Sequence, residues 1–280
     1  MEVLKIGIAD NIFIENCKNI LQNGTWDNSS VVRPSWQDGR PAHTISLFGI
    51  INRYNLQKEF PILTLRRTYL KNCIEELFWI WQQKSSDTTK LNCNIWDAWA
   101  KNGNIGCAYG EQLSIKHKYP EGEFDQVDRV LFDLKNNPSS RRIITNIYNH
   151  ADLHKMNLYP CAYGLQLSVK DGKLSGILNQ RSQDFLVANN WNVCQYAILL
   201  HIFAQVAGLT AHELIHVIGD AHIYDRHIDI VKELITKKPY EAPKLKINMA
   251  KNDFYSFNID DFELINYKYH EFKYKIPVAV

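Results

Sequence analysis

The chain has 280 residues, of which 45% are hydrophobic and 22% charged, and its formal net charge is +2 at neutral pH. This length predicts one large domain or two small ones. The near-neutral charge, without a long basic run, argues against a dedicated nucleic-acid-binding protein, whose usual signature is a basic stripe. A small anionic substrate is still compatible, because it needs only a few local arginines.

The composition also predicts a cytoplasmic protein. No apolar run approaches the roughly 20 residues that a membrane span needs, and the N-terminus lacks the basic start and cleavage site of an export signal. The cysteines are scattered without a Cys-x-x-Cys pair, which favours reduced thiols and argues against a metal site. They are Cys17, Cys73, Cys93, Cys107, Cys161 and Cys194.

Residues 10–22 carry apolar side chains at helical spacing, and Asn23-Gly24 predicts the end of this helix. The polar residues 25–43 predict a loop that contains two arginines, Arg33 and Arg40. Residues 44–54 alternate as expected of a strand.

A core helix is predicted over residues 66–82, with Glu76 on the flank of its apolar stripe. A carboxylate in that position is costly unless it is paired or protonated, so we expect its pKa to be raised. Such a group suits proton transfer. The alternative is an exposed glutamate at the edge of the stripe, which is our interpretation of Glu75.

Aromatic side chains follow a polar loop at residues 84–92 and cluster between Ile95 and Tyr109, a pattern that ordinary core packing would also explain. A helix is predicted over residues 124–136 and a strand over 143–148. Two adjacent arginines, Arg141 and Arg142, lie between the predicted helix and the predicted strand. Such a pair is usually solvated.

Two alternating runs flank Asp171-Gly172, which is a strong signal for a β-hairpin. The hairpin would bring Arg181 close to Cys161, and a cation beside a thiol favours the nucleophilic thiolate. The same stretch could hold an anion site at Arg181 and Ser182 and a polar pair of Asp184 and Asn192. The alternatives are a small buried cysteine, a surface ion pair at Arg181, and a helix N-cap at Asn192.

The helix expected after Asn192 is apolar almost all round, which predicts a buried central helix that ends at Gly208. A strand is predicted over residues 214–224, with His222 and Tyr224 on the same face. From the residues alone, His222 would be interpreted as a satisfied core histidine.

Several motifs occur together in a recognisable order. Pro160-Cys161, Gln180-Arg181-Ser182-x-Asp184, Asn192 and the run from Gly219 to Tyr224 have the order and spacing of the thymidylate synthase signature. The sequence therefore resembles this family from about Asp38 to Val280. It most resembles the branch of some bacilli and their phages, with which it shares the runs Trp81–Asp87 and Leu264–Lys268.

The resemblance implies a single α+β catalytic domain over residues 1–280, with a mixed sheet and helices around a long buried helix. One face of the sheet would form a homodimer interface. The implied reaction is the reductive methylation of dUMP to dTMP by 5,10-methylenetetrahydrofolate, which gives dihydrofolate, in the host cytoplasm if a phage encodes the protein. The implied catalytic residues are Cys161, Glu76, Asn192, Tyr109 and Arg181.

The resemblance also implies two sets of binding residues. Counting back from Phe48-Gly49 places the family's phosphate-binding arginine at Gly39, so Arg40, one place on, is the expected equivalent, and a solvated loop arginine is the alternative. The nucleotide would contact Arg40, Gln180, Arg181, Ser182, Asp184, Asn192, His222 and Tyr224, together with Arg141 and Arg142 of the second subunit. The folate would contact Arg66, Ile95, Trp96, Trp99, Asp184, Leu186, Trp191 and Val280.

The sequence departs from the family pattern at a few positions. Ala162 replaces the usual histidine after the nucleophile, and Ala188, Asn190 and Trp191 replace the usual Gly, Pro and Phe of the folate-facing segment. A nucleotide hydroxymethylase, in which water replaces hydride, is therefore the main alternative. Trp96 and the C-terminal Val-Ala-Val favour the synthase, because both help to exclude water.

A role in binding without catalysis has little support. A protein that mainly binds its own message is expected to carry a basic run or stripe, and the sequence shows none. A catalytically dead paralogue is disfavoured because the signature side chains are present. Asn192, rather than Asp, favours a uracil base over cytosine.

Overall fold

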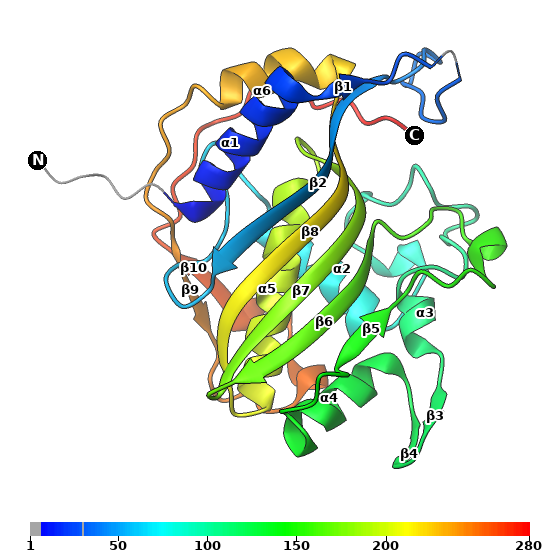
Figure 1. The fold of residues 1–280 in the computed structure, drawn as a ribbon, viewed down its shortest axis with the longest axis vertical. Coiled ribbons are helices and arrows are strands. Elements are labelled where there is room, and N and C mark those ends of the chain that lie inside the picture. The colour runs from blue at the N-terminus through cyan, green and yellow to red at the C-terminus, as the bar shows by residue number, and fades with distance from the viewer. Residues whose placement is uncertain (1–6, 30) are drawn as a thin grey trace, which may run out of the picture.

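A mixed six-stranded sheet forms the centre of the fold (Figure 1). The computed structural model describes residues 7–29 and 31–280. Strands β7 and β8 pair in parallel, and the other neighbouring strands of the sheet pair antiparallel. In spatial order the sheet contains β1 (Thr25–Trp26), β2 (Thr44–Asn55), β8 (Thr210–Tyr224), β7 (Lys173–Asp184), β6 (Ala162–Lys170) and β5 (Ile144–Asn146).

Two helices cover one face of this sheet, as Figure 1 shows. α5 (Asn189–Val206) is buried on nearly all sides, as its apolar sequence predicts. α2 (Leu70–Trp81) packs against it, with the ring of Trp81 edge-on to those of Tyr196 and Phe203. The predicted mixed α+β fold around a buried central helix is therefore confirmed.

Smaller elements surround this core. α1 (Ile8–Asn23) contacts β2 and β8, where the sequence predicts a helix over residues 10–22. The other α-helices and paired strands are α3 (Gly110–Ser114), α4 (Gln126–Asn136), α6 (Ile228–Leu234), β3 (His117–Tyr119), β4 (Gly122–Phe124), β9 (Lys244–Ile247) and β10 (Phe262–Ile265). No helix of the described part of the chain is long and apolar enough to cross a membrane.

The predicted hairpin joins β6 to β7. Asp171 and Gly172 both have positive φ, 49° and 71°, as a two-residue hairpin turn requires. The ladder runs back from this turn, and its register shifts at a β-bulge between Ala162 and Gly164. The backbone N–H of Arg181 then donates to the carbonyl of Cys161, with N···O 2.7 Å. The hairpin thus brings these two residues together as expected.

Several predicted boundaries are wrong. The helix expected over residues 66–82 begins at Leu70, and the strand expected from 214 begins at Thr210. Asn192 is not an N-cap: α5 begins at Asn189, and the Asn192 N–H donates to Ala188 within the helix. No side chain caps this helix start, so the sequence gives no local signal for it.

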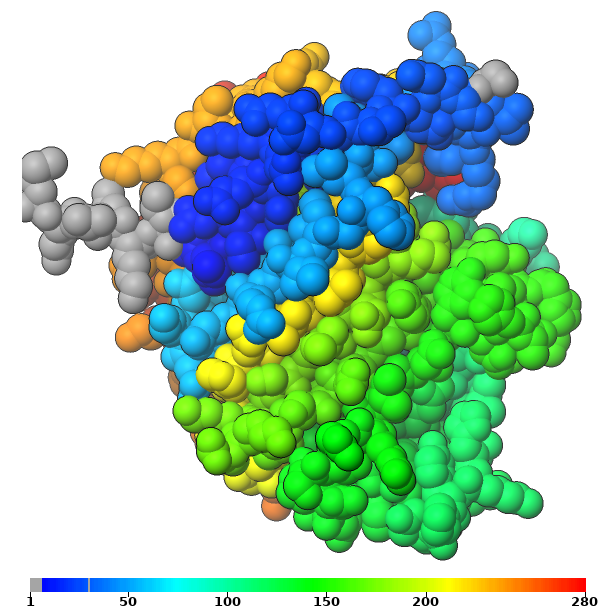
Figure 2. Space-filling view, in the orientation of Figure 1, coloured from blue at the N-terminus to red at the C-terminus, as the bar shows by residue number. Residues whose placement is uncertain are grey.

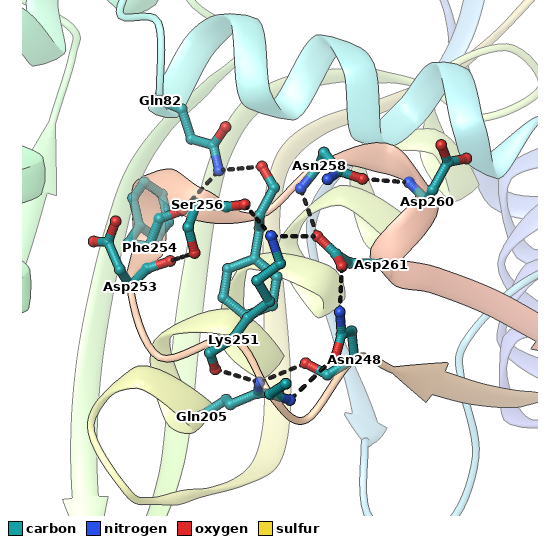
Figure 3. A network of polar contacts seen from close by, with 12 residues as sticks. Gln82, Gln205, Asn248, Lys251, Asp253, Phe254, Ser256, Asn258, Asp260 and Asp261 are labelled. Carbon is teal, nitrogen blue, oxygen red and sulfur yellow. Dashed lines mark hydrogen bonds and ion pairs between the residues drawn. The ribbon is translucent and has the colours of Figure 1, made fainter.

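The segment after β9 is held against both central helices (Figure 3). Gln205 of α5 donates to the carbonyls of Asn248 and Lys251, and Gln82, which follows α2, donates to that of Phe254. These amide contacts fasten the C-terminal part of the chain to the core.

The other face of the sheet is uncovered. In Figure 2, strands β2, β8, β7 and β6 form the surface directly. Phe48 is 90% exposed, Ile51 64% and Ile144 56%. Large apolar side chains gathered on one exposed face are typical of an interaction surface.

Candidate active site

A cavity of about 450 Å³ lies between β7, β8, the start of α5, α2 and the C-terminal tail. It brings together most of the side chains that the sequence singles out. They are Arg66, Glu76, Ile95, Trp96, Trp99, Tyr109, Cys161, Gln180, Arg181, Ser182, Asp184, Trp191, Asn192, His222 and Tyr224.

Cys161 lies at the cavity wall beside a cation and a phenol. Its Sγ is 3.6 Å from Nη2 of Arg181, and its backbone N–H donates to the hydroxyl of Tyr109. Burial raises the pKa of the Cys161 thiol, while Arg181, Tyr109 and Arg33 lower it. The net pKa of the Cys161 thiol lies above its ordinary value. Arg181 favours the thiolate, as expected, but the effect of desolvation is larger.

Glu76 is buried in the opposite wall and accepts three hydrogen bonds. Trp96 Nε1 donates to Oε1 at 2.7 Å, and both Trp191 Nε1 and Gln195 Nε2 donate to Oε2. Burial raises the pKa of Glu76 and the three donors lower it, with a net increase. The predicted rise is confirmed, and such a carboxyl suits proton transfer near neutral pH.

Asn192 belongs to a network of amides. Its Oδ1 accepts from Nε2 of Gln180 at 3.1 Å and from Nε2 of Gln183 at 3.3 Å. Its Nδ2 donates to Oε1 of Gln195 at 3.1 Å. One N–H of the Asn192 amide is thereby left for a ligand.

Asp184 is not hydrogen-bonded to Asn192, contrary to the expected polar pair. Its Oδ1 accepts from the backbone N–H groups of Leu186 and Val187 and lies 3.7 Å from Nδ1 of His227. Burial raises the pKa of Asp184, but His227, His222 and the Val187 N–H outweigh it and hold the pKa below its usual value. Asp184 is therefore an anion whose partners lie behind the cavity wall.

His222 and Tyr224 line the cavity from the same face of β8, as predicted. Their rings meet edge to face, with centroids 5.0 Å apart. His222 Nδ1 is 2.7 Å from Oδ2 of Asp220, which leaves Nε2 for another partner. The position of His222 in the cavity argues against the interpretation as a core histidine.

Arg33, rather than Arg40, is the loop arginine of the cavity. Residues 36–40 form a turn in which the Trp36 N–H donates to the Arg40 carbonyl and Gly39 has φ 77°. This turn leaves Arg40 largely exposed beside Asp38, outside the cavity lining. The expectation for Arg40 fails because counting along the sequence cannot follow a loop of different shape.

An apolar wall lies next to the cysteine. Trp96 packs edge-on against both Trp99 and Tyr109, and Ile95 adds to the same wall. The C-terminal tail contributes Ile276, Val278 and Ala279. The tail is tied to the Arg33 loop by two backbone hydrogen bonds between Ser35 and Val280.

Two expected folate contacts lie outside the cavity lining. Val280 forms the backbone pair with Ser35, so its neighbours line the cavity instead. Leu186 is fully buried, and its carbonyl accepts from Nη2 of Arg66. Arg141 and Arg142 are exposed at the approach to β5 and also lie outside this cavity.

Sequence reasoning assigned Gln195 no role in the site. Together with Asn192 it could form a loose capping box, yet its Nε2 lies 2.6 Å from the Glu76 carboxylate, 119 positions away in the chain. The one local signal is that Gln195 lies three residues after Asn192, on the same side of the helix. Among the described residues, no group of three or more His, Cys, Asp or Glu side chains could hold a metal ion.

Comparison with known proteins agrees with this geometry. A sequence profile described as thymidylate synthase matches residues 11–280, starting ahead of Asp38, where the resemblance was expected to begin. The chain is 48% identical over 269 residues to the thymidylate synthase of Bacillus phage phi3T, covering 94% of this chain and 96% of that one. Identity to thymidylate synthase 1 of Bacillus subtilis strain 168 is 47% at the same coverage.

The fold is similar to that of a solved structure, the thermostable thymidylate synthase A from Bacillus subtilis. The TM-score is 0.92 at 45% sequence identity, and the match covers 97% of this chain and 99% of the other. These relatives include bacilli and one of their phages, which confirms the predicted branch.

Proposed function

Because the chain belongs to the thymidylate synthase family, we propose that it converts dUMP to dTMP, with 5,10-methylenetetrahydrofolate as the donor of the one-carbon unit and hydride. Dihydrofolate is the second product. The observation that carries the proposal is that one cavity holds a cysteine, a buried carboxyl and an amide side by side: Cys161, Glu76 and Asn192. Residues 1–280 then act as one catalytic domain.

Each of these residues has a role that follows from its chemistry. The Cys161 thiolate adds to C6 of the uracil, which makes C5 nucleophilic. The guanidinium of Arg181 stabilises the thiolate against the burial that opposes it. Glu76 accepts and returns protons at C5 and O4, and Asn192 binds the N3–O4 edge of the base.

The residues of the cavity fit a reduced folate. The apolar wall of Trp96, Trp99 and Ile95 suits a flat ring. Arg66 lines the cavity, and its buried Nε has no hydrogen-bond partner in the described part of the chain. When bound, the folate supplies the one-carbon unit and the hydride, while Trp96 and the tail residues Val278 and Ala279 exclude water.

The hydroxymethylase alternative is not favoured. The sequence profile and the relatives compared above all carry the name thymidylate synthase. Trp191, at the most unusual position of the folate-facing segment, donates to Glu76 and so retains a place in the cavity wall. The departures therefore leave a complete cavity lining around Cys161.

The nucleotide phosphate has a defined place in this proposal. Arg33, Arg181 and Ser182 line the same cavity. Arg33→Ala should raise the KM for dUMP by about 10- to 100-fold, because a charge-assisted hydrogen bond is worth about 1.5–3 kcal/mol. Arg40→Ala is the matched control and should stay within about twofold, a change of under about 0.5 kcal/mol. Initial rates measured at varied dUMP concentration give both KM values. A larger increase in KM for the Arg40 variant than for the Arg33 variant would contradict the assignment of Arg33 to the phosphate.

The uncovered sheet face supports a homodimer. Phe48, Ile51 and Ile144 make it apolar, and a second hollow on this face is lined by Phe48, Tyr163 and Arg181. Arg181 therefore borders both the cavity and the hollow. Arg141 and Arg142, exposed beside β5, are expected to extend from one subunit toward the phosphate site of the other.

The test of the proposed reaction is the formation of dihydrofolate, followed by absorbance. The protein mixed with dUMP and methylenetetrahydrofolate should give a steady increase, and dCMP should give none. An absorbance change with dCMP alone would contradict the proposal, because Asn192 is assigned to uracil.

A further inference from the structure

Gln195 contacts both the carboxylate assigned to proton transfer and the amide assigned to base recognition. Its Nε2 donates to Oε2 of Glu76 at 2.6 Å and to the carbonyl of Cys73 at 3.2 Å. Its Oε1 accepts from Nδ2 of Asn192 at 3.1 Å. The side chain is almost completely buried, so these contacts are shielded from water.

The orientation of this amide is fixed by its acceptors. A carboxylate and a carbonyl can only accept, so Gln195 must turn its NH₂ group toward Glu76 and Cys73. The contact with Cys73 persists when Glu76 is protonated, because it involves a backbone carbonyl. Gln195 therefore presents Oε1 to Asn192 in both protonation states of Glu76.

The orientation is passed on to Asn192. Because Oε1 of Gln195 accepts, Asn192 must turn Nδ2 toward it and Oδ1 toward Gln180 and Gln183. Gln180 is held in the matching orientation, since its Nε2 also donates to the carbonyl of Ser182 at 3.2 Å, and its Oε1 faces Nε2 of the buried His216 at 2.8 Å.

We propose that Gln195 is a positioning residue of the thymidylate synthase reaction, which holds the Asn192 amide in the orientation that reads uracil and holds the Glu76 carboxylate in place. This inference rests on the proposed function. Uracil presents a donor at N3 and an acceptor at O4, whereas cytosine presents the reverse pattern. A flipped Asn192 amide would suit cytosine, and Gln195 opposes the flip from the Nδ2 side while Gln180 and Gln183 oppose it from the Oδ1 side. Gln195 therefore contributes to substrate specificity.

The other titratable groups around Glu76 carry no charge that could stabilise its carboxylate in place of Gln195. The titratable side chains that face it are Cys73 on α2, Cys93 in the following loop, Tyr109 before α3, and Tyr196 on α5. Burial raises the pKa of all four, so they are neutral near pH 7. Among the described residues no cation forms an ion pair with Glu76, which leaves the three hydrogen bonds to stabilise its ionised form.

The test compares Gln195→Leu and Gln195→Glu with the matched control Gln205→Leu. Gln205 lies on the same helix and donates to two backbone carbonyls (Figure 3), but it does not line the cavity. Calorimetry with dUMP and dCMP measures the ratio of their dissociation constants. A pH profile of kcat/KM for dUMP measures the ionisation of Glu76.

In Gln195→Leu the preference for dUMP over dCMP should fall about tenfold, as expected for one lost hydrogen bond. The acid limb of the pH profile should shift to higher pH by about one unit, because Glu76 loses one of the donors that stabilise its ionised form. Gln195→Glu keeps the size of the side chain, so it decides the question if the leucine variant does not fold. It should move the acid limb further, because two adjacent carboxylates cannot both ionise. Gln205→Leu should change neither quantity.

If both Gln195 variants fold and match Gln205→Leu in base preference and pH profile, the proposal is overturned. If the wild-type protein forms no dihydrofolate from dUMP, the proposed function fails. In that case the role of Gln195 is still decided by comparing wild type and variants in the ratio of the dissociation constants for dUMP and dCMP, because calorimetry needs no turnover.

Discussion

Replacing Cys161 with serine should lower the rate of dTMP formation by about 10³-fold or more, the range seen when an enzyme loses its nucleophile. A serine hydroxyl ionises far less readily than a thiol. The residue after Cys161 is Ala162, and the neighbours of Sγ are Arg181, the Tyr159 carbonyl and the Tyr109 hydroxyl. Burial raises the pKa of Tyr109, so its hydroxyl is protonated and the immediate contacts offer no general base. Binding of dUMP should persist, because the arginines and Asn192 remain.

Single-turnover rates and dUMP calorimetry would measure the two effects separately. Cys107→Ser is the control, since Cys107 is another half-buried thiol that does not line the cavity. Near-normal turnover in the Cys161 variant would exclude covalent catalysis through this residue. A similar loss in the Cys107 variant would point to a general effect on folding.

The second large effect is expected at Glu76. Glu76→Gln should reduce kcat by about 10²- to 10⁴-fold, the usual contribution of a positioned acid–base group. The glutamine also loses acceptors for Trp96, Trp191 and Gln195, so thermal unfolding must be measured alongside activity. Glu75→Gln is the matched control, because Glu75 is the neighbouring carboxyl, half-buried and bonded to Asn92 at the surface.

The pH profile of the wild-type protein tests the same residue. Acting as a base, Glu76 is active only when ionised, so activity falls as pH decreases through its pKa. Burial raises that pKa above its ordinary value, so the acid limb should lie at higher pH than for an exposed glutamate. The limb should vanish in Glu76→Gln and persist in Glu75→Gln. The same profile in both variants would assign the acid limb to another group.

Features that depend on short stretches of sequence could be predicted. The Asp171-Gly172 turn predicts the pairing of β6 and β7 and the general approach of Arg181 to Cys161, although a β-bulge between Ala162 and Gly164 shifts the register by one residue before these two residues meet. The apolar pattern of α5 predicts its burial. The position of Glu76 on the flank of the apolar stripe of α2 predicts a buried carboxyl with a raised pKa.

Features that depend on distant contacts could not be predicted. Gln195 meets Glu76 only because α2 and α5 pack together, and nothing near either residue indicates it. Arg33 replaces Arg40 because of the turn between them, and Val280 is held away from the cavity lining by its pairing with Ser35. Asp184 turns toward His227 instead of Asn192, since β8 and the turn after it place an imidazole behind the wall.

Hydride, rather than water, is expected to complete the one-carbon transfer. The most direct measurement is the mass of the nucleotide formed from dUMP and a methylenetetrahydrofolate that carries deuterium at the hydride position. We expect dTMP one mass unit heavier than unlabelled dTMP, from one transferred deuterium, together with dihydrofolate. Hydroxymethylated nucleotide without deuterium, together with tetrahydrofolate, would contradict this mechanism and would make the segment from Ala188 to Trp191 the first place to look for the entry of water.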